Sequence, residues 1–496
     1  MQAHSVLDRR RAGILLHITS LPGSLGNGDL GREARNFIDF LVSVGVSVWQ
    51  TLPINPTHPD GSPYQCLSAH AGNPLLIDLN GLVDRGWLQR VDVHDGGEDP
   101  QAHRKRCLSQ AFASFRVQSD HELARAQAEF VAENARWLQD YALFMALREK
   151  FNGLTWQDWP EPLRDRQPDA LNQVRVQLAE TIARINFEQF VFFHQWRLLR
   201  EYANSRGVIL FGDIPIFVAG DSADVRSRQE EFDLDDQGRP RVVAGVPPDY
   251  FSATGQRWGN PHYRWDRMEK DGFKWWLERF QGQLKLYDWV RIDHFRGFEA
   301  YWEIPVDSET AIDGHWVKAP GAQLLSALFN SVNGASLPLV AEDLGIITPE
   351  VDALRRSFNI PGMLILQFAF DGNRDNPYAP HNHEANSVVY TGTHDNDTTL
   401  SWFESLSDDQ KAQVYRYLGN PTLPMPEALI HCALASVSRL AILPMQDVLG
   451  LGVGHRMNTP GTTVGNWNWR FDWSQLSSER VGRLSEWVSL YGRAVN

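Results

Sequence analysis

Three carboxylate side chains each stand at the carboxyl-terminal end of an apolar run. They are Asp293 in WVRIDHFRGF, Glu342 in LPLVAEDLG and Asp395 in VVYTGTHDNDT. In a parallel α/β barrel, side chains at the carboxyl ends of the strands project into the active site. Two such carboxyls suffice to cleave a glycosidic bond, and Asp293 and Glu342 fit that pair. Asp395 is then left to hold the sugar.

The residues next to Asp293 and Glu342 in the sequence suggest which of the two is the nucleophile and which is the general acid. Arg291 precedes Asp293 by two positions, so both side chains face the same way on a strand, and the guanidinium favours an ionised nucleophile. Glu342 and Asp343 are adjacent, so only one of them can face the barrel mouth. A partly desolvated Glu342 would have the raised pKa of a general acid. The alternative for each acid is a buried structural ion pair.

A metal site is the main chemical alternative near the third acid. His394, Asp395 and Asp397 are all competent ligands, and His381 and His383 add to the set. However, the HNH segment lies in a polar loop, and no HExxH motif or cysteine cluster accompanies it. His394 and Asp395 serve equally well as donor and acceptor for sugar hydroxyls, so the sequence favours a site without a metal.

Composition restricts the partners. The chain has 496 residues and a formal net charge of −14, which disfavours nucleic acid and anionic membranes and leaves a neutral or cationic small molecule. Its three cysteines form no CxxC pair, and the apolar run GILLHI is too short for a signal peptide or a membrane span. We therefore expect a cytoplasmic protein. Several of its 18 tryptophans, including Trp258, Trp467 and Trp469, lie in polar, Gly-rich segments where they could stack on sugars.

Eight continuous runs of apolar residues predict strands that are buried on both faces. They span residues 13–18, 46–54, 208–216, 289–295, 337–344, 362–368, 387–395 and 440–448. Helix-like stretches lie between them, so the pattern predicts an α/β fold, a (β/α)8 TIM barrel. A doubly wound open sheet is the alternative, although no GxGxxG motif follows any of the runs.

The spacing of the runs predicts insertions within a single catalytic barrel of residues 1–496. Residues 84–206 form a mainly helical insertion, rich in Ala, Leu, Glu, Gln and Arg with helical periodicity. Residues 217–275 form a second insertion, whose segment VPPDYFSATGQRWGNP (246–261) is predicted to be a loop throughout.

At this point a resemblance to a known family is plain. FGDIPI, VRIDHFRGF, VAEDLG and TGTHDNDT look like the four signature regions of the α-amylase clan. More narrowly, LHITSLPG, SPYQ, GNPLLIDL, PPDYFS, GQRWGNP and NTPGTTVGNWNWR resemble the 4-α-glucanotransferases, also called amylomaltases or disproportionating enzymes. The likeness extends over nearly the whole chain.

The resemblance implies a role for each matching position. Asp293 would be the nucleophile, Glu342 the acid and base, and Asp395 the group that holds the sugar in a distorted ring. The positions implied to bind substrate are Arg291, His394, Asp213, His294, Tyr64, Trp258, Gln256, Asn260 and Asn466, with Tyr250 and Phe251 in a lid loop of the second insertion.

The expected activity is transfer of α-1,4-glucan segments between maltooligosaccharides by a retaining double displacement, without a cofactor. Transfer requires a sugar hydroxyl to outcompete water for the covalent intermediate, which a hydrophobic lid and aromatic groups would favour. The alternatives are an α-1,4-glucan hydrolase, a non-catalytic glucan-binding protein and a metal-dependent barrel hydrolase.

Overall fold

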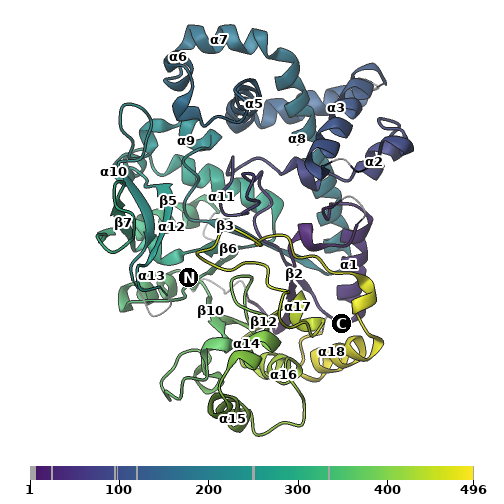
Figure 1. Cartoon of the computed structure of the whole chain (residues 1–496), viewed down its shortest axis with the longest axis vertical. Coiled ribbons are helices and arrows are strands. Elements are labelled where there is room, and N and C mark those ends of the chain that lie inside the picture. The colour runs from purple at the N-terminus through teal and green to yellow at the C-terminus, as the bar shows by residue number, and fades with distance from the viewer. Residues whose placement is uncertain are drawn as a thin grey trace.

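Eight parallel strands form the centre of the molecule (Figure 1). The computed structural model describes residues 7–23, 26–93, 97, 99–118, 121–248, 252–332 and 336–494. The strands are β1 (Arg11–Leu15), β2 (Val48–Gln50), β3 (Ile209–Pro215), β6 (Trp289–Asp293), β9 (Leu339–Ala341), β10 (Gly362–Ile365), β11 (Ser387–Tyr390) and β12 (Leu440–Pro444). Each predicted run overlaps one of them, although β1 begins two residues before its run, so the eight predicted strands are confirmed.

The sheet closes on itself almost completely. Its order is β10-β11-β12-β1-β2-β3-β6-β9, and every neighbouring pair is parallel. The two outer strands approach each other where the backbone N–H of Ala341 donates to the carbonyl of Pro361 at 2.9 Å. The fold is therefore the predicted TIM barrel and not an open doubly wound sheet.

Helices follow most of the barrel strands. These are α1 (Arg32–Ser43), α8 (Ala179–Ser205), α11 (Lys274–Leu286), α12 (Gly321–Ser331), α13 (Pro349–Ser357), α16 (Glu427–Ala435) and α18 (Ser478–Leu490). In α1, Ala34, Phe37, Ile38 and Leu41 are buried, which is the helical spacing of an apolar face turned to a core. Between β10 and β11, where every residue is described, the chain makes only 3-10 turns at Leu366–Phe368 and Pro380–Asn382.

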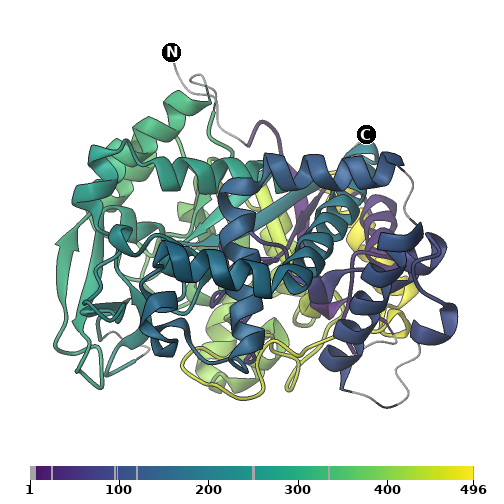
Figure 2. The ribbon, with the colours of Figure 1, turned by 90° about the horizontal axis from the view of Figure 1, so that it is seen from above.

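Further helices occupy the long connections. They are α2 (Leu79–Asp84), α3 (Pro100–Gln118), α4 (His121–Glu133), α5 (Ala135–Lys150), α6 (Glu161–Arg164), α7 (Pro168–Gln177), α9 (Ala223–Ser227), α10 (Trp265–Lys270), α14 (Thr399–Ser405), α15 (Asp408–Tyr417) and α17 (Met445–Val448). The blue helices α5, α6 and α7 stand at the top of Figure 1, and Figure 2 shows them covering one side of the molecule. No helix among the described residues is long and apolar enough to cross a membrane.

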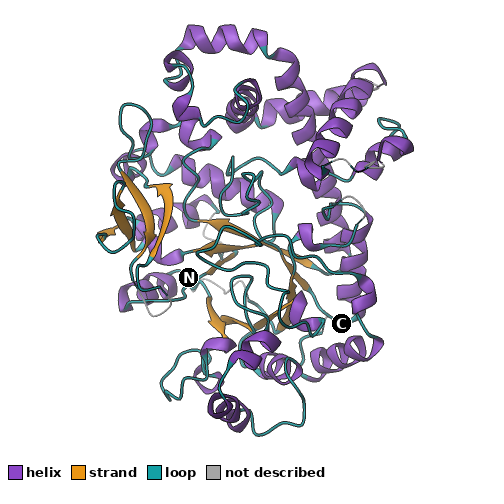
Figure 3. Ribbon diagram, viewed as in Figure 1, coloured by secondary structure: helices purple, strands orange, loops and turns teal. Residues whose placement is uncertain are grey.

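A second, four-stranded antiparallel sheet lies beside the barrel (Figure 3). It consists of β4 (Val242–Val246), β5 (Gln256–Pro261), β7 (Ala300–Pro305) and β8 (His315–Lys318) in the order β5-β4-β7-β8. The prediction that residues 246–261 are a loop throughout is therefore wrong. The polar, Gly- and Pro-containing sequence of β5 hid this strand. Its partner β4 is near in the chain, but β4 also pairs with β7, about 60 residues later, and that contact leaves no local pattern.

The pairing of β4 with β5 depends on a glycine. A Cβ atom at Gly245 would lie 2.1 Å from the carbonyl oxygen of Gln256, and the ladder shifts register between Val243 and Gly245. Only a residue without a side chain lets the two backbones approach this closely. This sheet carries Gln256, Trp258 and Asn260.

Candidate active site

Arg291 joins two carboxyl groups on neighbouring strands. Asp213 on β3 and Arg291 on β6 are register partners, so their side chains lie next to each other. Nη1 of Arg291 donates to Oδ2 of Asp213 at 2.6 Å, and Nη2 donates to Oδ1 of Asp293 at 2.9 Å. The Arg291 side chain is 4% exposed, whereas that of Asp293 is 29% exposed. Asp293 is therefore held from within the barrel and remains open to a substrate.

Glu342 follows the last residue of β9, beside the end of β6. Its Oε2 accepts the backbone N–H of His294 at 2.7 Å, and its Oε1 accepts that of Leu344 at 3.0 Å. His294 has φ of 55°, in the left-handed region that side chains rarely adopt. Because of this turn, the residue next to Asp293 contacts Glu342 through its backbone.

Asp343 has a separate environment, as the alternation along the strand predicts. Its Oδ1 accepts the backbone N–H of Met363 on β10 at 2.7 Å, and its Oδ2 lies 3.0 Å from Nε of Arg355 on α13. Asp343 thus links β9 to its neighbours while Glu342 faces the site.

The pKa values of Glu342, Asp213 and Asp293 are set by their burial and by the nearby positive charge of Arg291. Burial raises the pKa of Glu342 to about 8, with a further contribution from the negative charge of Asp293. Burial also raises the pKa of Asp213, to about 7, and that of Asp293, while the charge of Arg291 opposes all three shifts. Arg291 makes its direct hydrogen bonds to the two aspartates and none to Glu342, so Glu342 is the group that keeps a proton at neutral pH.

Asp395 lies in the loop after β11, which ends at Tyr390 instead of extending to residue 395 as predicted. The Asn458 side-chain amide donates to Oδ1 of Asp395 at 2.6 Å, and Nε2 of His394 lies 3.3 Å from Oδ2. Arg456 donates to the Asp395 carbonyl at 2.8 Å. With its side chain 43% exposed, Asp395 is held at a fixed position and faces open space.

An aromatic group borders the acids. The Tyr64 hydroxyl donates to Oδ2 of Asp213 at 2.7 Å, and its ring stacks on that of His394, with centroids 5.2 Å apart and planes 11° apart. Trp467 lies 6.0 Å from Tyr64 and 6.1 Å from His394, measured between ring centroids. Burial lowers the pKa of His394, so its imidazole is neutral at physiological pH.

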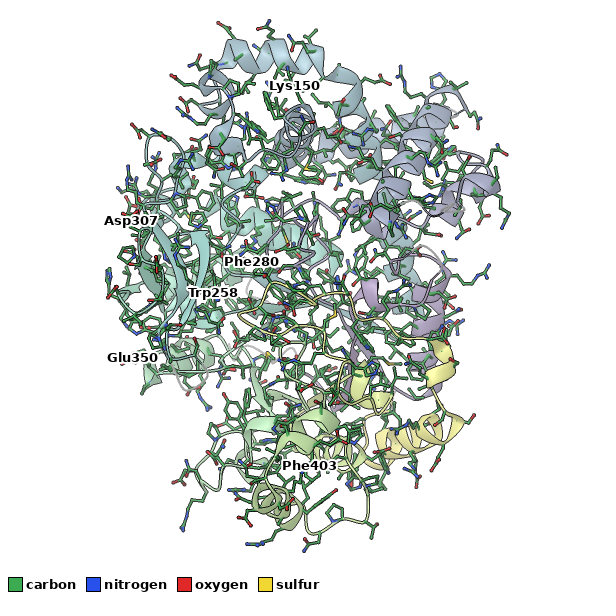
Figure 4. The ribbon with its side chains drawn as sticks, viewed as in Figure 1. Lys150, Trp258, Phe280, Asp307, Glu350 and Phe403 are labelled. Atoms are coloured by element: carbon green, nitrogen blue, oxygen red, sulfur yellow. The ribbon has the colours of Figure 1, made fainter. Side chains whose placement is uncertain are left out.

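Trp258 lies on β5, on the side of the small sheet that faces the barrel (Figure 4). Its ring meets that of His294 edge to face, with centroids 4.9 Å apart, and its Nε1 donates to Oε1 of Gln256 at 3.2 Å. Burial lowers the pKa of His294 to about 3, which keeps this imidazole neutral. Nε2 of His294 is buried and has no hydrogen-bond partner among the described residues.

Two of the predicted binding residues are occupied by internal hydrogen bonds. The Asn260 amide accepts from Gln65 at 3.2 Å and donates to the carbonyl of Val218 at 2.9 Å. The Asn466 amide accepts from the backbone of Thr459 at 2.9 Å and donates to the carbonyl of Thr462 at 2.9 Å. Both shape the loops around the site. Tyr250 and Phe251 lie outside the described residues.

Two side chains that the sequence analysis did not name belong to the site, as does Trp467, which it named only as a ring that could stack on sugars. Asn458 and Arg456 hold Asp395 but come more than 60 residues later in the chain. Asn458 opens the segment NTPGTTVGNWNWR, which resembles the family, whereas no local pattern marks Arg456. Trp467 had a signal, because tryptophan is unusual in the Gly-rich segment VGNWNW. Trp469 of the same segment is 9% exposed and donates to His455 at 3.2 Å, so it belongs to the core.

The histidines considered as metal ligands have other partners. His381 contacts the Tyr417 hydroxyl at 2.6 Å, and His383 lies between the Ser436 hydroxyl and the Tyr378 carbonyl at 2.7 and 2.8 Å. Across the described part of the chain, no three His, Cys, Asp or Glu side chains gather in a way that could hold a metal ion.

Comparisons with known proteins identify relatives of the whole chain. Residues 16–476 match the family model described as 4-alpha-glucanotransferase. The 4-alpha-glucanotransferase of Thermus thermophilus is 51% identical over 96% of this chain and 97% of its own. The chloroplastic/amyloplastic enzyme of Solanum tuberosum is 44% identical over 98% of this chain and 87% of its own. A solved amylomaltase from Streptococcus agalactiae, in complex with acarbose, is 40% identical and superposes with a TM-score of 0.95 over 98% of this chain and 100% of its own.

Proposed function

The chain belongs to the 4-alpha-glucanotransferase family, and from this premise we propose how its own residues carry out the transfer. The protein is a retaining glycosyl-transferring enzyme that moves α-1,4-glucan segments between maltooligosaccharides. The observation that carries the assignment of roles is the contrast between two neighbouring carboxyls. Arg291 donates directly to Asp293, whereas Glu342 accepts only backbone N–H groups among the described residues.

In the first step, Asp293 attacks the anomeric carbon of the donor sugar as a carboxylate. Arg291 favours this ionised form and orients the carboxyl by its 2.9 Å hydrogen bond. Glu342 donates its proton to the departing glycosidic oxygen, which leaves as the non-reducing-end hydroxyl of the released sugar. A pKa of about 8 supplies that proton at neutral pH. The product is a covalent β-glucosyl-enzyme.

In the second step, the ionised Glu342 takes a proton from the 4-hydroxyl of an acceptor glucan. That oxygen attacks the anomeric carbon from the face opposite Asp293, and the bond to Asp293 breaks. Two inversions retain the α configuration, and this geometry requires the two carboxyls to lie about 5–5.5 Å apart.

Asp395 and His394 are suited to hold the reacting sugar. Asp395 is an anionic acceptor fixed by Asn458, and the neutral His394 beside it offers a ring nitrogen to a hydroxyl. Trp258 on one side and Tyr64 with Trp467 on the other supply aromatic faces. These faces exclude water from the intermediate, which favours attack by a sugar hydroxyl over hydrolysis.

We propose three further properties as corollaries. The chain forms one catalytic unit in which residues 84–206 and 217–275 are insertions. The substrates are neutral glucans, and neither nucleic acid nor a membrane takes part, consistent with the net charge of −14. The location is the cytoplasm, since the described cysteines Cys66, Cys107 and Cys432 form no disulfide with one another, as in a reducing compartment.

The product profile from maltotriose tests the activity. Transfer of a glucan segment from one maltotriose to another yields glucose together with maltooligosaccharides longer than the substrate. Chromatography of the products should show both from the earliest time points. Glucose and maltose without any longer product would identify a hydrolase and overturn the proposal.

A further inference from the structure

A cavity of about 970 Å³ lies on the outer side of the barrel. Residues of α4, α5, α8, α9 and α11 line it, together with Ser68 and His70 from the loop after β2. None of the three proposed catalytic carboxylates is among its lining residues. Its volume is near the upper end of the range of about 300–1,000 Å³ for ligand sites.

The cavity runs from an open mouth to a buried floor. At the mouth, the side chains of Arg136 and Arg197 are 75% and 56% exposed. At the floor, the side chains of His70 and Asp224 are 11% and 4% exposed and lie 3.6 Å apart. A ligand bound between the mouth and the floor would replace its contacts with water by contacts with the cavity walls along its whole length.

A row of aromatic rings forms one wall. Phe130 on α4 lies 5.5 Å from Phe193 on α8, and Phe193 lies 5.7 Å from Trp137 on α5, measured between ring centroids. Trp137 also stacks on His70 at 6.2 Å with planes 16° apart. Phe130, Trp137 and Phe193 are only half-buried, so each has surface left to cover, whereas His70 is nearly buried at the floor. Consecutive apolar faces of this kind suit the apolar faces of consecutive sugar rings.

The charges around the cavity cancel. Five carboxylates and five Arg or Lys side chains line it, and burial keeps the two lining histidines neutral by lowering their pKa values. Glu278 on α11 pairs with Arg136 at 2.8 Å and with Arg228 at 3.1 Å, across three helices. The walls therefore offer both donors and acceptors without a net field, which selects against a strongly charged ligand and suits a neutral polyol.

We propose that this cavity is a second carbohydrate site, which binds a segment of α-1,4-glucan outside the active site. The inference rests on the proposed function for the identity of the sugar. The floor of the cavity touches the loop that carries Tyr64, because Asp224 accepts the backbone N–H of Ala69 at 2.7 Å and Gln283 donates to its carbonyl at 3.3 Å. A glucan held here is anchored beside the segment that shapes the active site.

Counting the glucans bound per chain tests the proposal. Equilibrium dialysis with maltoheptaose is carried out on the inactive Asp293→Asn protein, which should bind two molecules per chain. Adding Trp137→Ala should reduce the count to one, because it removes the central ring of the aromatic wall. Adding Phe193→Ala provides a second, independent truncation of the same wall.

The matched control adds Trp402→Ala instead. Trp402 is also half-buried, on α14, packs against Phe370 with centroids 6.1 Å apart, and does not line the cavity. This variant should keep two bound glucans. A single bound glucan in the Asp293→Asn protein, or two in both wall variants, would overturn the second site. A failure to make longer products from maltotriose would instead refute the proposed function, so the two failures are distinguishable.

Discussion

The backbone N–H of His294 donates a 2.7 Å hydrogen bond to Oε2 of Glu342, so the residue after the proposed nucleophile orients the proposed acid. The strands that carry the two groups, β6 and β9, are neighbours, and Ile292 pairs with Ala341 just before them. The left-handed turn at His294, with φ of 55°, points this N–H across to the adjacent strand. One backbone conformation therefore fixes the relative position of both carboxyls.

This relationship predicts that residue 294 acts mainly through its backbone. A His294→Gly variant keeps the N–H and adopts the positive φ without strain, whereas His294→Val must force a β-branched residue into it. Strain of about 1–3 kcal/mol corresponds to roughly 10-fold or more in kcat if it displaces Glu342. Transfer kinetics and melting temperatures of both variants are the measurement. Both lose the ring contact with Trp258 equally, so a Val variant as active as the Gly variant would contradict the idea.

The separate roles of the two carboxyls predict opposite responses to an activated donor. α-Glucosyl fluoride needs no protonation of its leaving group, so Glu342→Gln should form the glucosyl-enzyme from it. Azide, which needs no general base, should then release α-glucosyl azide. Asp293→Asn should lose orders of magnitude in rate with every donor, because no covalent intermediate forms.

The control for this experiment is the natural donor. Maltotriose still requires a proton on the leaving oxygen, so azide should give Glu342→Gln little activity with it. If azide restored both variants with glucosyl fluoride to give the same α-azide, the assignment of nucleophile and acid would have to be exchanged or abandoned.

The pKa of Glu342, raised by burial to about 8, predicts the alkaline limit of activity. The acid must be protonated in the free enzyme, so kcat/KM should fall as the pH rises through about 8. It should also fall at low pH as Asp293 takes up a proton, at a pH above its ordinary value of 3.8 because burial raises its pKa. A kcat/KM profile that stays flat well above pH 9 would exclude Glu342 as the acid.

The same pKa makes a prediction for stability. The folded-state pKa of Glu342 lies above its ordinary value of 4.5, so its contribution to the free energy of unfolding is complete below pH 4.5. That contribution is lost as the pH rises through about 8. The melting temperature of Glu342→Gln should therefore gain on the wild type between these pH values. A gain at low pH alone would contradict the sign.

The barrel and its acids could be predicted because the patterns that indicate them, apolar runs that end in an acidic residue, each span only a few neighbouring residues. Each apolar run overlaps a strand, Asp293 is the last residue of β6, and Glu342 comes directly after β9. Asp395 was placed on a strand because VVYTG continues the apolar pattern, yet β11 ends at Tyr390 and Asn458 holds the aspartate in a loop. Its position depends on a partner far away in the chain.

Other parts of the site depend on long-range contacts that no local pattern encodes. The small sheet that carries β5 is completed by the pairing of β4 with β7, about 60 residues later, so the polar sequence of β5 by itself predicted a loop. Asn260 and Asn466 were predicted to contact glucan from their motifs alone. Their amides also form hydrogen bonds to backbone groups of neighbouring loops, which only the folded chain reveals, and their contact with glucan stays a prediction.

Asp343 is predicted to position Glu342 without touching the substrate. It ties the end of β9 to β10 through Met363 and lies 3.0 Å from Arg355, whose side chain is 10% exposed. Asp343→Ala removes both the acceptor for the Met363 N–H and the carboxylate beside Arg355, which leaves Asp352 as the remaining carboxylate of Arg355 among the described residues. Losing this buried pairing should cost about 1–3 kcal/mol of stability.

The effect of the substitution at Asp343 on kcat should be distinguishable from a general loss of stability. A shift of the β9 end moves Glu342 from its productive position, so kcat should fall by roughly 10-fold while KM changes little, because no sugar contact is removed. The matched control is Asp352→Ala, which removes the other carboxylate of Arg355 but leaves the link between β9 and β10 intact. Its kcat should stay near the wild-type value. Equal losses of kcat in both variants would show that Arg355, and not the tie to Met363, sets the position of the acid.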